Sequence, residues 1–114
     1  MDAGALIANG SDFPVESPNP FFGLHASITR QDKDNGPVGG WYPEERMTDS
    51  EAFASFTLDA AYSGFQESLL GSLEPGKKAD FIVLDRDIFA IPDSEIWQAK
   101  ALETWVNGSQ VHGK

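Results

Sequence analysis

The stretch GSLEPGKKADFIVLD, at residues 71–85, decides the fold that this sequence predicts. Its first part, residues 71–76, reads as a strand that enters a Pro75-Gly76 turn, because proline and glycine suit the two central positions of such a turn. Residues 79–85 then form an apolar run, which predicts a strand that is apolar on both faces. This stretch therefore predicts a β region in the last third of the chain.

The sequence beyond this stretch predicts a hairpin. Residues 104–106 and 109–111 flank Asn107-Gly108, the pair of residues most typical of a two-residue hairpin turn. The last third of the chain is therefore predicted to be a small sheet.

Another short strand is predicted near the N-terminus, over residues 4–10, apart from the strands of the last third of the chain. Its apolar run and its small residues suit a buried strand with close neighbours. The run ends at Ser11-Asp12, which Phe13-Pro14 follows. A strand fixes the backbone of such an aspartate while the loop opens its side chain to a pocket, as catalytic groups are placed in (β/α) barrels. Asp12 is therefore the candidate catalytic residue.

Helices are predicted between these two β regions. Pro20 can open a helix from Phe21 to about Gln31, with apolar residues at helical spacing on one face. After a loop over residues 32–46, which is rich in Gly and Pro, Thr48 and Glu51 form a capping-box pattern. A helix is expected to run from there to about Tyr62.

Composition excludes several classes of function. The 114 residues suit one modest core and fall far short of the ~250 that a whole eight-stranded barrel needs. The net charge of −10 repels phosphate groups, so neither nucleic acid nor a membrane surface is an expected partner. The chain lacks cysteine and lacks the features of a signal peptide at its start, which together favour a cytoplasmic location.

Three stretches carry a resemblance to a known family: residues 10–14 with the prolines that follow, the helix over residues 48–61, and residues 71–85. The chain resembles the C-terminal end of the amidohydrolase superfamily, most closely the YtcJ-like amidohydrolase-3 branch. The resemblance implies an α/β fold, or α+β for an isolated fragment. Residues 1–70 would be the last β/α part of a TIM-like barrel with the helices after it, and residues 71–114 the C-terminal strands of a small composite β-sandwich.

The resemblance also implies an activity. Members of this family are metal-dependent hydrolases of non-peptide C–N bonds in amides, ureas or cyclic amidines, and act on small molecules. Asp12 matches the aspartate that ends the last barrel strand, lies at the metal, which is most often zinc, and handles the proton of the attacking water. The family's other ligands precede the matching region, so the isolated chain is expected to bind no metal and to be inactive.

Other polar residues have two interpretations each. Asp12 is either a metal ligand in the parent site or a residue that binds loop N–H groups. His25 is read as a helix-face residue and His112 as solvated, rather than as ligands. The loop carboxylates Glu16, Glu44 and Glu45 either meet a substrate at the mouth of a pocket or are only solvated. Trp41 and Tyr42 either line a pocket or pack against the edge of the barrel. Lys77 and Lys78 are interpreted as solvated, and Asp80 and Asp85 as structural turn and edge residues.

Two function hypotheses follow. The chain is either a fragment of an amidohydrolase that contributes one active-site carboxylate, or a non-catalytic α/β module that binds a partner or ligand. Under both hypotheses, the strands lack the neighbours that they would have in a whole family enzyme, and they expose backbone donors and apolar faces. A homo-oligomer is therefore expected.

Overall fold

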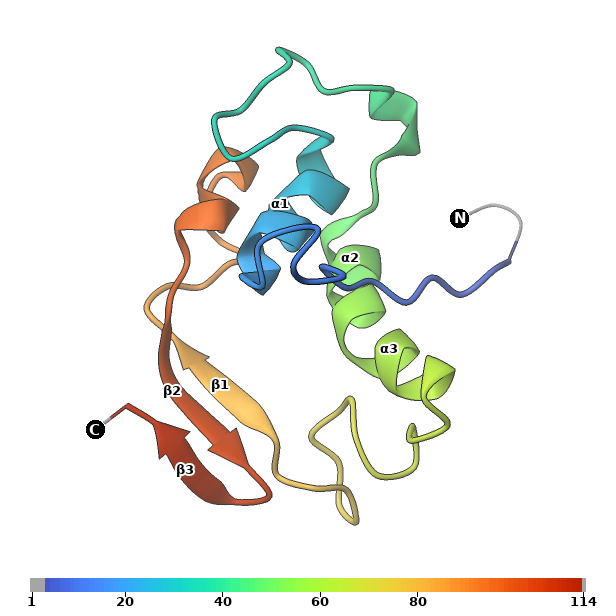
Figure 1. Ribbon diagram of the computed structural model, residues 1–114, viewed down its shortest axis with the longest axis vertical. Coiled ribbons are helices and arrows are strands. Elements are labelled where there is room, and N and C mark those ends of the chain that lie inside the picture. The colour runs from blue at the N-terminus through green and yellow to red at the C-terminus, as the bar shows by residue number, and fades with distance from the viewer. Residues whose placement is uncertain (1–3, 114) are drawn as a thin grey trace.

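The computed structural model describes residues 4–113, which form a group of helices and a separate three-stranded sheet (Figure 1). Three α-helices and two 3-10 helices are present among these residues: α1 (Pro20–Thr29), η1 (Pro43–Glu45), α2 (Asp49–Phe56), α3 (Leu58–Ser63) and η2 (Asp93–Gln98). The strands are β1 (Phe81–Leu84), β2 (Ala101–Val106) and β3 (Ser109–His112).

Helix α1 begins and ends as its local sequence requires. The Asn19 side chain accepts a hydrogen bond from the backbone N–H of Phe21 at 3.0 Å, and Pro20 occupies the first helical position. The apolar face predicted for this helix is buried. The helix ends at Thr29, two residues before the predicted end, because Arg30 adopts the left-handed conformation with φ of 58°.

The predicted capping box is confirmed. The Thr48 hydroxyl accepts from the backbone N–H of Glu51, and the Glu51 carboxylate accepts from the backbone N–H of Thr48 at 2.9 Å. The helix is not continuous to Tyr62, however, since Thr57 interrupts it with φ of −126° and ψ of −91°. The Thr57 hydroxyl donates to the carbonyl oxygen of Phe53 at 2.8 Å, a local bond that competes with regular helix geometry.

The C-terminal sheet is antiparallel in the order β1-β2-β3. Residues Asn107 and Gly108 form the predicted hairpin turn, both with positive φ, as a type I′ turn requires. Phe81 lies opposite Trp105, and their rings stack with centroids 5.5 Å apart. The predicted strand over residues 79–85 and the hairpin are therefore confirmed, the strand with the shorter bounds of β1.

The strand predicted at residues 71–74 is wrong, while the turn after it is confirmed. Gly76 has φ of 97°, and the backbone N–H of Lys77 donates to the carbonyl oxygen of Glu74 at 3.1 Å, which closes the turn. Residues 71–74 are irregular because Gly71 lies against α3: a Cβ placed there would be 2.9 Å from the Cβ of Ala61. Close packing on a helix takes the place of strand pairing.

The N-terminal strand predicted over residues 4–10 is also absent. This segment is irregular, and Leu6 is 61% exposed. Its main anchor is Asn9, whose backbone N–H donates to the carbonyl oxygen of Ser55 at 2.9 Å and whose side chain donates to the Ser55 hydroxyl at 2.8 Å. A β-strand needs a hydrogen-bonded neighbour, and among residues 4–113 no strand lies beside this segment.

The buried core lies among α1, α2, η2 and the segments next to η2, and of the strand residues only Leu84, at the end of β1, packs against it among residues 4–113. Its members are apolar and at most 8% exposed: Phe21, Leu24, Ile28, Ala52, Ile88, Ile96 and Ala99. The sheet differs, since Ile82 and Val83 point to opposite faces of β1 and are 45% and 40% exposed. Among the described residues, none of the helices is long and apolar enough to cross a membrane.

Candidate functional site

Asp12 lies in an exposed turn between the N-terminal segment and α1. Its φ is 49°, and its carbonyl oxygen accepts from the backbone N–H of Val15 at 2.8 Å. Within residues 4–113 no hydrogen bond to its carboxylate is present, so the alternative in which this carboxylate binds loop N–H groups lacks support there. The backbone of the turn is therefore closed without the carboxylate, which is exposed to solvent.

A groove of about 780 Å³ runs beside this turn. One wall comes from residues around Asp12, including Ser11 and Glu16, and the other from Asp32 and Lys33 beyond the end of α1. Asp12 does not line the groove, whereas its neighbour Ser11 does. Of the three carboxylates for which the sequence suggested a pocket position (Glu16, Glu44 and Glu45), only Glu16 lines the groove, and it is exposed to solvent as well.

Asp32 is the most strongly held carboxylate on the groove. Its Oδ1 accepts from the backbone N–H groups of Gly36 and Asp34, both at 2.9 Å. These two bonds hold the pKa of Asp32 below its usual value, and the positive charges of Lys33 and His25 act in the same direction. Sequence reasoning missed Asp32 as a groove residue because nothing in residues 32–46 showed how the loop folds back on α1.

The described residues do not fit a metal ion. Among residues 4–113 no three His, Asp or Glu side chains come together as a ligand set, and zinc in catalytic sites takes three protein ligands. Asp12 alone does not make such a site.

Neither histidine is placed as a ligand. His25 is fully buried in α1, and both ring nitrogens contact backbone carbonyl oxygens, of Asp93 at 3.0 Å and of Asp32 at 2.9 Å. His112 lies exposed on β3. The interpretation of His25 as a helix residue is confirmed, but its burial and its two partners were not predicted.

The aromatic pair in the long loop packs on the end of α1. The Arg30 guanidinium lies 5.2 Å from the ring centre of Trp41, and Tyr42 meets Trp41 edge-on at 4.6 Å. Both aromatic residues are more than half exposed and lie outside the groove. Glu44 and Glu45 are exposed in η1, which suits the interpretation of solvated carboxylates.

Three charged residues near the sheet hold the backbone in place. The Asp80 carboxylate accepts from the backbone N–H of Asn107 at 2.7 Å, and the Asp85 carboxylate accepts from that of Lys100 at 2.9 Å. Both aspartates are thus structural, as predicted. Lys77 differs from prediction: its side chain is only 13% exposed, because its ammonium group donates to Ser72 and pairs with Glu74 at 3.2 Å across the Pro-Gly turn.

Comparison with known proteins places this geometry in a family. The profile of the amidohydrolase family Amidohydro_3 matches residues 1–112. Three relatives align with nearly the whole chain: Protein LONG AFTER FAR-RED 3 of Arabidopsis thaliana (33% identity, 98% of this chain, 19% of the relative), the N-substituted formamide deformylase of Arthrobacter pascens (31%, 95% and 19%) and YtcJ of Bacillus subtilis (32%, 100% and 22%). The chain thus spans about a fifth of the length of these relatives.

Solved structures show the same fold. An amidohydrolase from Thermotoga maritima MSB8 superimposes with a TM-score of 0.71 at 20% identity, over 99% of this chain and 24% of that protein. Fold and site together define the class as an α/β fragment of an amidohydrolase with an exposed carboxylate in the turn before α1. The chain belongs to the amidohydrolase family.

Proposed function

We propose that this chain is the C-terminal portion of a metal-dependent amidohydrolase that hydrolyses non-peptide C–N bonds of small molecules. The observation that carries this proposal is Asp12: its carboxylate is exposed beside a groove, its backbone turn is formed without it, and it lies in a region that the family profile matches. The name of the Arthrobacter relative, an N-substituted formamide deformylase, supports an amide as the type of bond cleaved.

In this proposal Asp12 takes up the proton of the attacking water and returns it to the leaving nitrogen. A carboxylate within hydrogen-bond reach of both groups suits such proton transfer. Zinc, held with ligands from outside this chain, would supply the activated water. The residues of the groove, among them Glu16 and Lys33, would orient the substrate.

Metal retention tests whether the chain alone is inactive. The purified 114-residue chain would be incubated with zinc or manganese, freed of unbound metal and assayed for metal by atomic emission. We expect no stoichiometric metal in the native chain, in Asp12→Asn, or in a control with another exposed carboxylate removed, Glu16→Gln. One bound metal per chain that disappears only in Asp12→Asn would show a competent site in this chain.

A complementation experiment tests the fragment itself. The remaining part of a family barrel, with its His and acidic ligands, would be supplied as a separate chain. We expect metal retention and amide hydrolysis to appear only in the mixture with native chain and to be lost with Asp12→Asn. A mixture whose hydrolysis is the same with Asp12→Asn would remove Asp12 from the proposal.

The alternative function is a non-catalytic, oligomeric α/β module, derived from an amidohydrolase, that binds a partner or ligand. The observation that favours it is the sheet, since β1 and β3 are its two edges and apolar side chains such as Val83 and Val106 are exposed. Light scattering at micromolar concentration tests the oligomer that such a module requires. A dimer or larger assembly that dissociates in Val83→Lys, but not in a control on the helices such as Ser63→Lys, would support the alternative, whereas a monomer would contradict it.

A further inference from the structure

The groove beside the Asp12 turn has an apolar floor. Much of its lining is apolar or small, and comes from Pro18, Pro20, Phe22, Gly23, Ala26 and Phe56. The ring of Phe56 reaches α1 because residue 23 is a glycine, where a Cβ would lie 2.5 Å from that ring. The volume of about 780 Å³ is within the range of about 300–1,000 Å³ that is usual for small-molecule sites. The floor therefore suits the apolar part of a small molecule.

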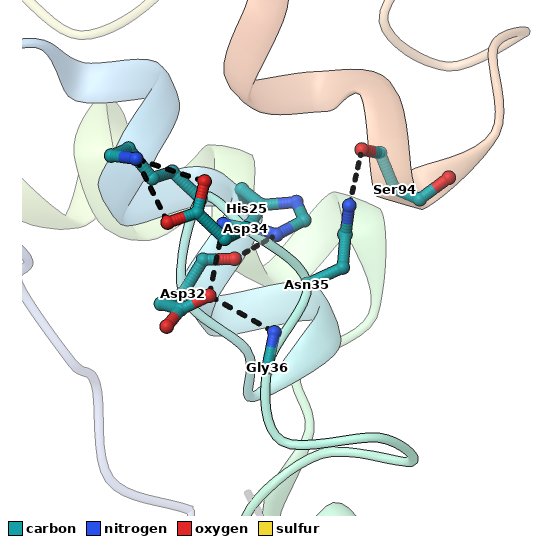
Figure 2. Close-up of polar contacts among 7 residues, drawn as sticks. His25, Asp32, Asp34, Asn35, Gly36 and Ser94 are labelled. Carbon is teal, nitrogen blue, oxygen red and sulfur yellow. Dashed lines mark hydrogen bonds and ion pairs between the residues drawn. The ribbon is translucent and has the colours of Figure 1, made fainter.

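One oxygen of the Asp32 carboxylate is free at this groove. The two loop N–H bonds described above both go to its Oδ1, whereas Oδ2 accepts no hydrogen bond from residues 4–113. Figure 2 shows both bonds on one oxygen of the carboxylate. Because Asp32 lines the groove and is exposed, its Oδ2 is available to a hydrogen-bond donor of a ligand.

The backbone of Asp32 is fixed as well. Its N–H donates to the carbonyl oxygen of Gly36 at 2.8 Å, and its own carbonyl oxygen lies 2.9 Å from Nε2 of the buried His25. In the same loop, the Asn35 side chain donates to the carbonyl oxygen of Ser94 at 3.4 Å (Figure 2). The carboxylate is therefore held in place before a ligand arrives, which lowers the entropic cost of binding.

The charged groups on the groove favour a cation. Glu16, before α1, and Asp32, after it, both line the groove and are acidic. Lys33 lines it too, but its ammonium group donates to both carboxylate oxygens of Asp34 at 2.9 Å. The whole chain has a net charge of −10, which attracts positively charged ligands.

The start of α1 does not reverse this preference. The beginning of a helix attracts anions through its free N–H groups. Here Pro20 has no N–H, and the Asn19 side chain accepts from the N–H of Phe21 at 3.0 Å. The N–H of Phe22 donates to the carbonyl oxygen of Asn19 at 3.2 Å. The helix start thus has few free donors for an anion.

We propose that the groove binds a small organic cation with an apolar body, such as an arylalkyl ammonium ion. The ammonium group donates to Oδ2 of Asp32, and Glu16 adds a second negative charge nearby. The apolar body lies over Phe22 and Phe56, whose ring faces also attract a cation. This binding requires no metal; only the further statement that such a cation is the substrate rests on the proposed function.

Three probes with the same apolar body test the role of charge: phenethylammonium, phenethyl alcohol and phenylpropionate. Each would be titrated into the 114-residue chain near neutral pH and followed by the backbone amide signals of Gly23, Ala26 and Phe56. We expect the ammonium ion to bind about tenfold more tightly than the alcohol, and the carboxylate more weakly than the alcohol. Equal affinity for the ammonium ion and the alcohol, a preference for the carboxylate, or no binding of the ammonium ion would overturn the proposal.

A matched pair of variants tests the anchoring carboxylate. Asp32→Asn keeps an oxygen that can accept the two loop N–H bonds but removes the charge. We expect the affinity for phenethylammonium to fall about tenfold, and that for phenethyl alcohol to stay the same. Glu44→Gln removes one negative charge from η1, outside the groove, and should change neither affinity. If Asp32→Asn bound the ammonium ion as tightly as the native chain, Asp32 would not be the anchor and the proposal would be wrong.

A third variant tests the location. Ala26 is exposed on α1 and lines the groove, so Ala26→Phe fills the groove without disturbing the buried core. We expect binding of the ammonium ion and of the alcohol to be lost. Unchanged binding in Ala26→Phe would place the probes elsewhere and contradict the proposal. If Asp32→Asn does not fold, the three probes and Ala26→Phe decide it.

Failure of this inference can be told apart from failure of the proposed function. If the native chain does not bind phenethylammonium but the complemented mixture hydrolyses an amide, the cation site alone is wrong. If the chain binds the ammonium ion as expected but the mixture shows neither metal retention nor hydrolysis, the proposed function alone is wrong.

Discussion

The helical half and the sheet half of this chain are stabilised to different degrees. The helical half, formed by α1, α2, α3 and η2, contains the buried apolar core, while among the described residues no member of β1, β2 or β3 is fully buried. Both halves have regular backbone hydrogen bonds and well-formed turns. The difference teaches that local sequence is enough to form the sheet, whereas the described residues leave its faces largely exposed.

Two isoleucines offer the largest test of this comparison. Ile96 in η2 is 2% exposed, and Ile82 in β1 is 45% exposed. Ile96→Ala should lower the free energy of unfolding by about 2–4 kcal/mol, because it leaves a cavity in the core. Ile82→Ala makes the same chemical change in a half-exposed position and should cost less than about 1 kcal/mol. Denaturant unfolding, monitored by tryptophan fluorescence, measures both.

Equal losses in the two variants would break the comparison. They would mean that Ile82 is covered in solution, and repetition at several protein concentrations would then show whether a second copy covers it. If the loss in free energy of unfolding grew with protein concentration only for Ile82→Ala, the exposed sheet would be identified as an assembly surface.

Much of the fold could be predicted because its determinants are local. The capping box at Thr48 and Glu51, the turn at Pro75-Gly76 and the hairpin at Asn107-Gly108 each depend on a few adjacent residues. The apolar face of α1 followed from helical spacing in the same way. Such features form with or without the rest of a family barrel.

The predictions that were wrong concern segments whose conformation depends on residues far away in the sequence. Residues 4–10 have a strand-like composition, but a strand forms only beside another strand. Gly71 lies against Ala61 and Leu58, which no local pattern reveals. The helix η2, which supplies the core residue Ile96, was not predicted either, because its stability comes from packing on α1.

The same limits applied to the candidate site. Asp12 was proposed from its place at the end of an apolar run, which does not form a strand, and from a family resemblance. The groove beside it depends on a loop that returns to α1 through His25 and Asp32. Single residues at the ends of elements can be read from sequence. The partners that a fold brings to them cannot, since they come from segments far apart in the chain.

Two glycines provide a second test, of intermediate size, of how the halves are connected. Gly71 and Gly76 both have strongly positive φ, of 87° and 97°. A Cβ at Gly71 would lie 2.9 Å from the Cα of Leu58 in α3, whereas nothing lies within 4 Å of one at Gly76. Gly76→Ala should therefore cost about 1 kcal/mol from backbone strain alone, and Gly71→Ala about 2–3 kcal/mol from strain and overpacking together.

Thermal unfolding of the two alanine variants measures this difference. Because the backbone strain is nearly the same in both, the additional loss in Gly71→Ala reports the contact between the connecting segment and α3. A loss no larger than that of Gly76→Ala would show that the segment does not pack on the helical half in solution.

The smallest expected effect concerns acid stability at the junction of the halves. The Asp85 carboxylate, just after β1, pairs with Arg86 at 3.0 Å and accepts from the backbone N–H of Lys100. These contacts, the Arg86 bond first, hold the pKa of Asp85 below its usual value of 3.8. The stability they contribute is therefore present above that value and is lost as pH falls below it, through the lower pKa of the folded state.

Asp85→Asn should reduce the loss of stability that the native chain shows on acidification through this range. The matched control is Asp59→Asn on α3, whose carboxylate has no hydrogen bond to a residue in the range 4–113. Urea midpoints measured from neutral to acid pH should converge for native chain and Asp85→Asn at the acid end, and remain parallel for Asp59→Asn. If Asp85→Asn also remained parallel to the native chain, the end of β1 would not depend on this ion pair, and the sheet would be joined to the helical half by backbone bonds alone.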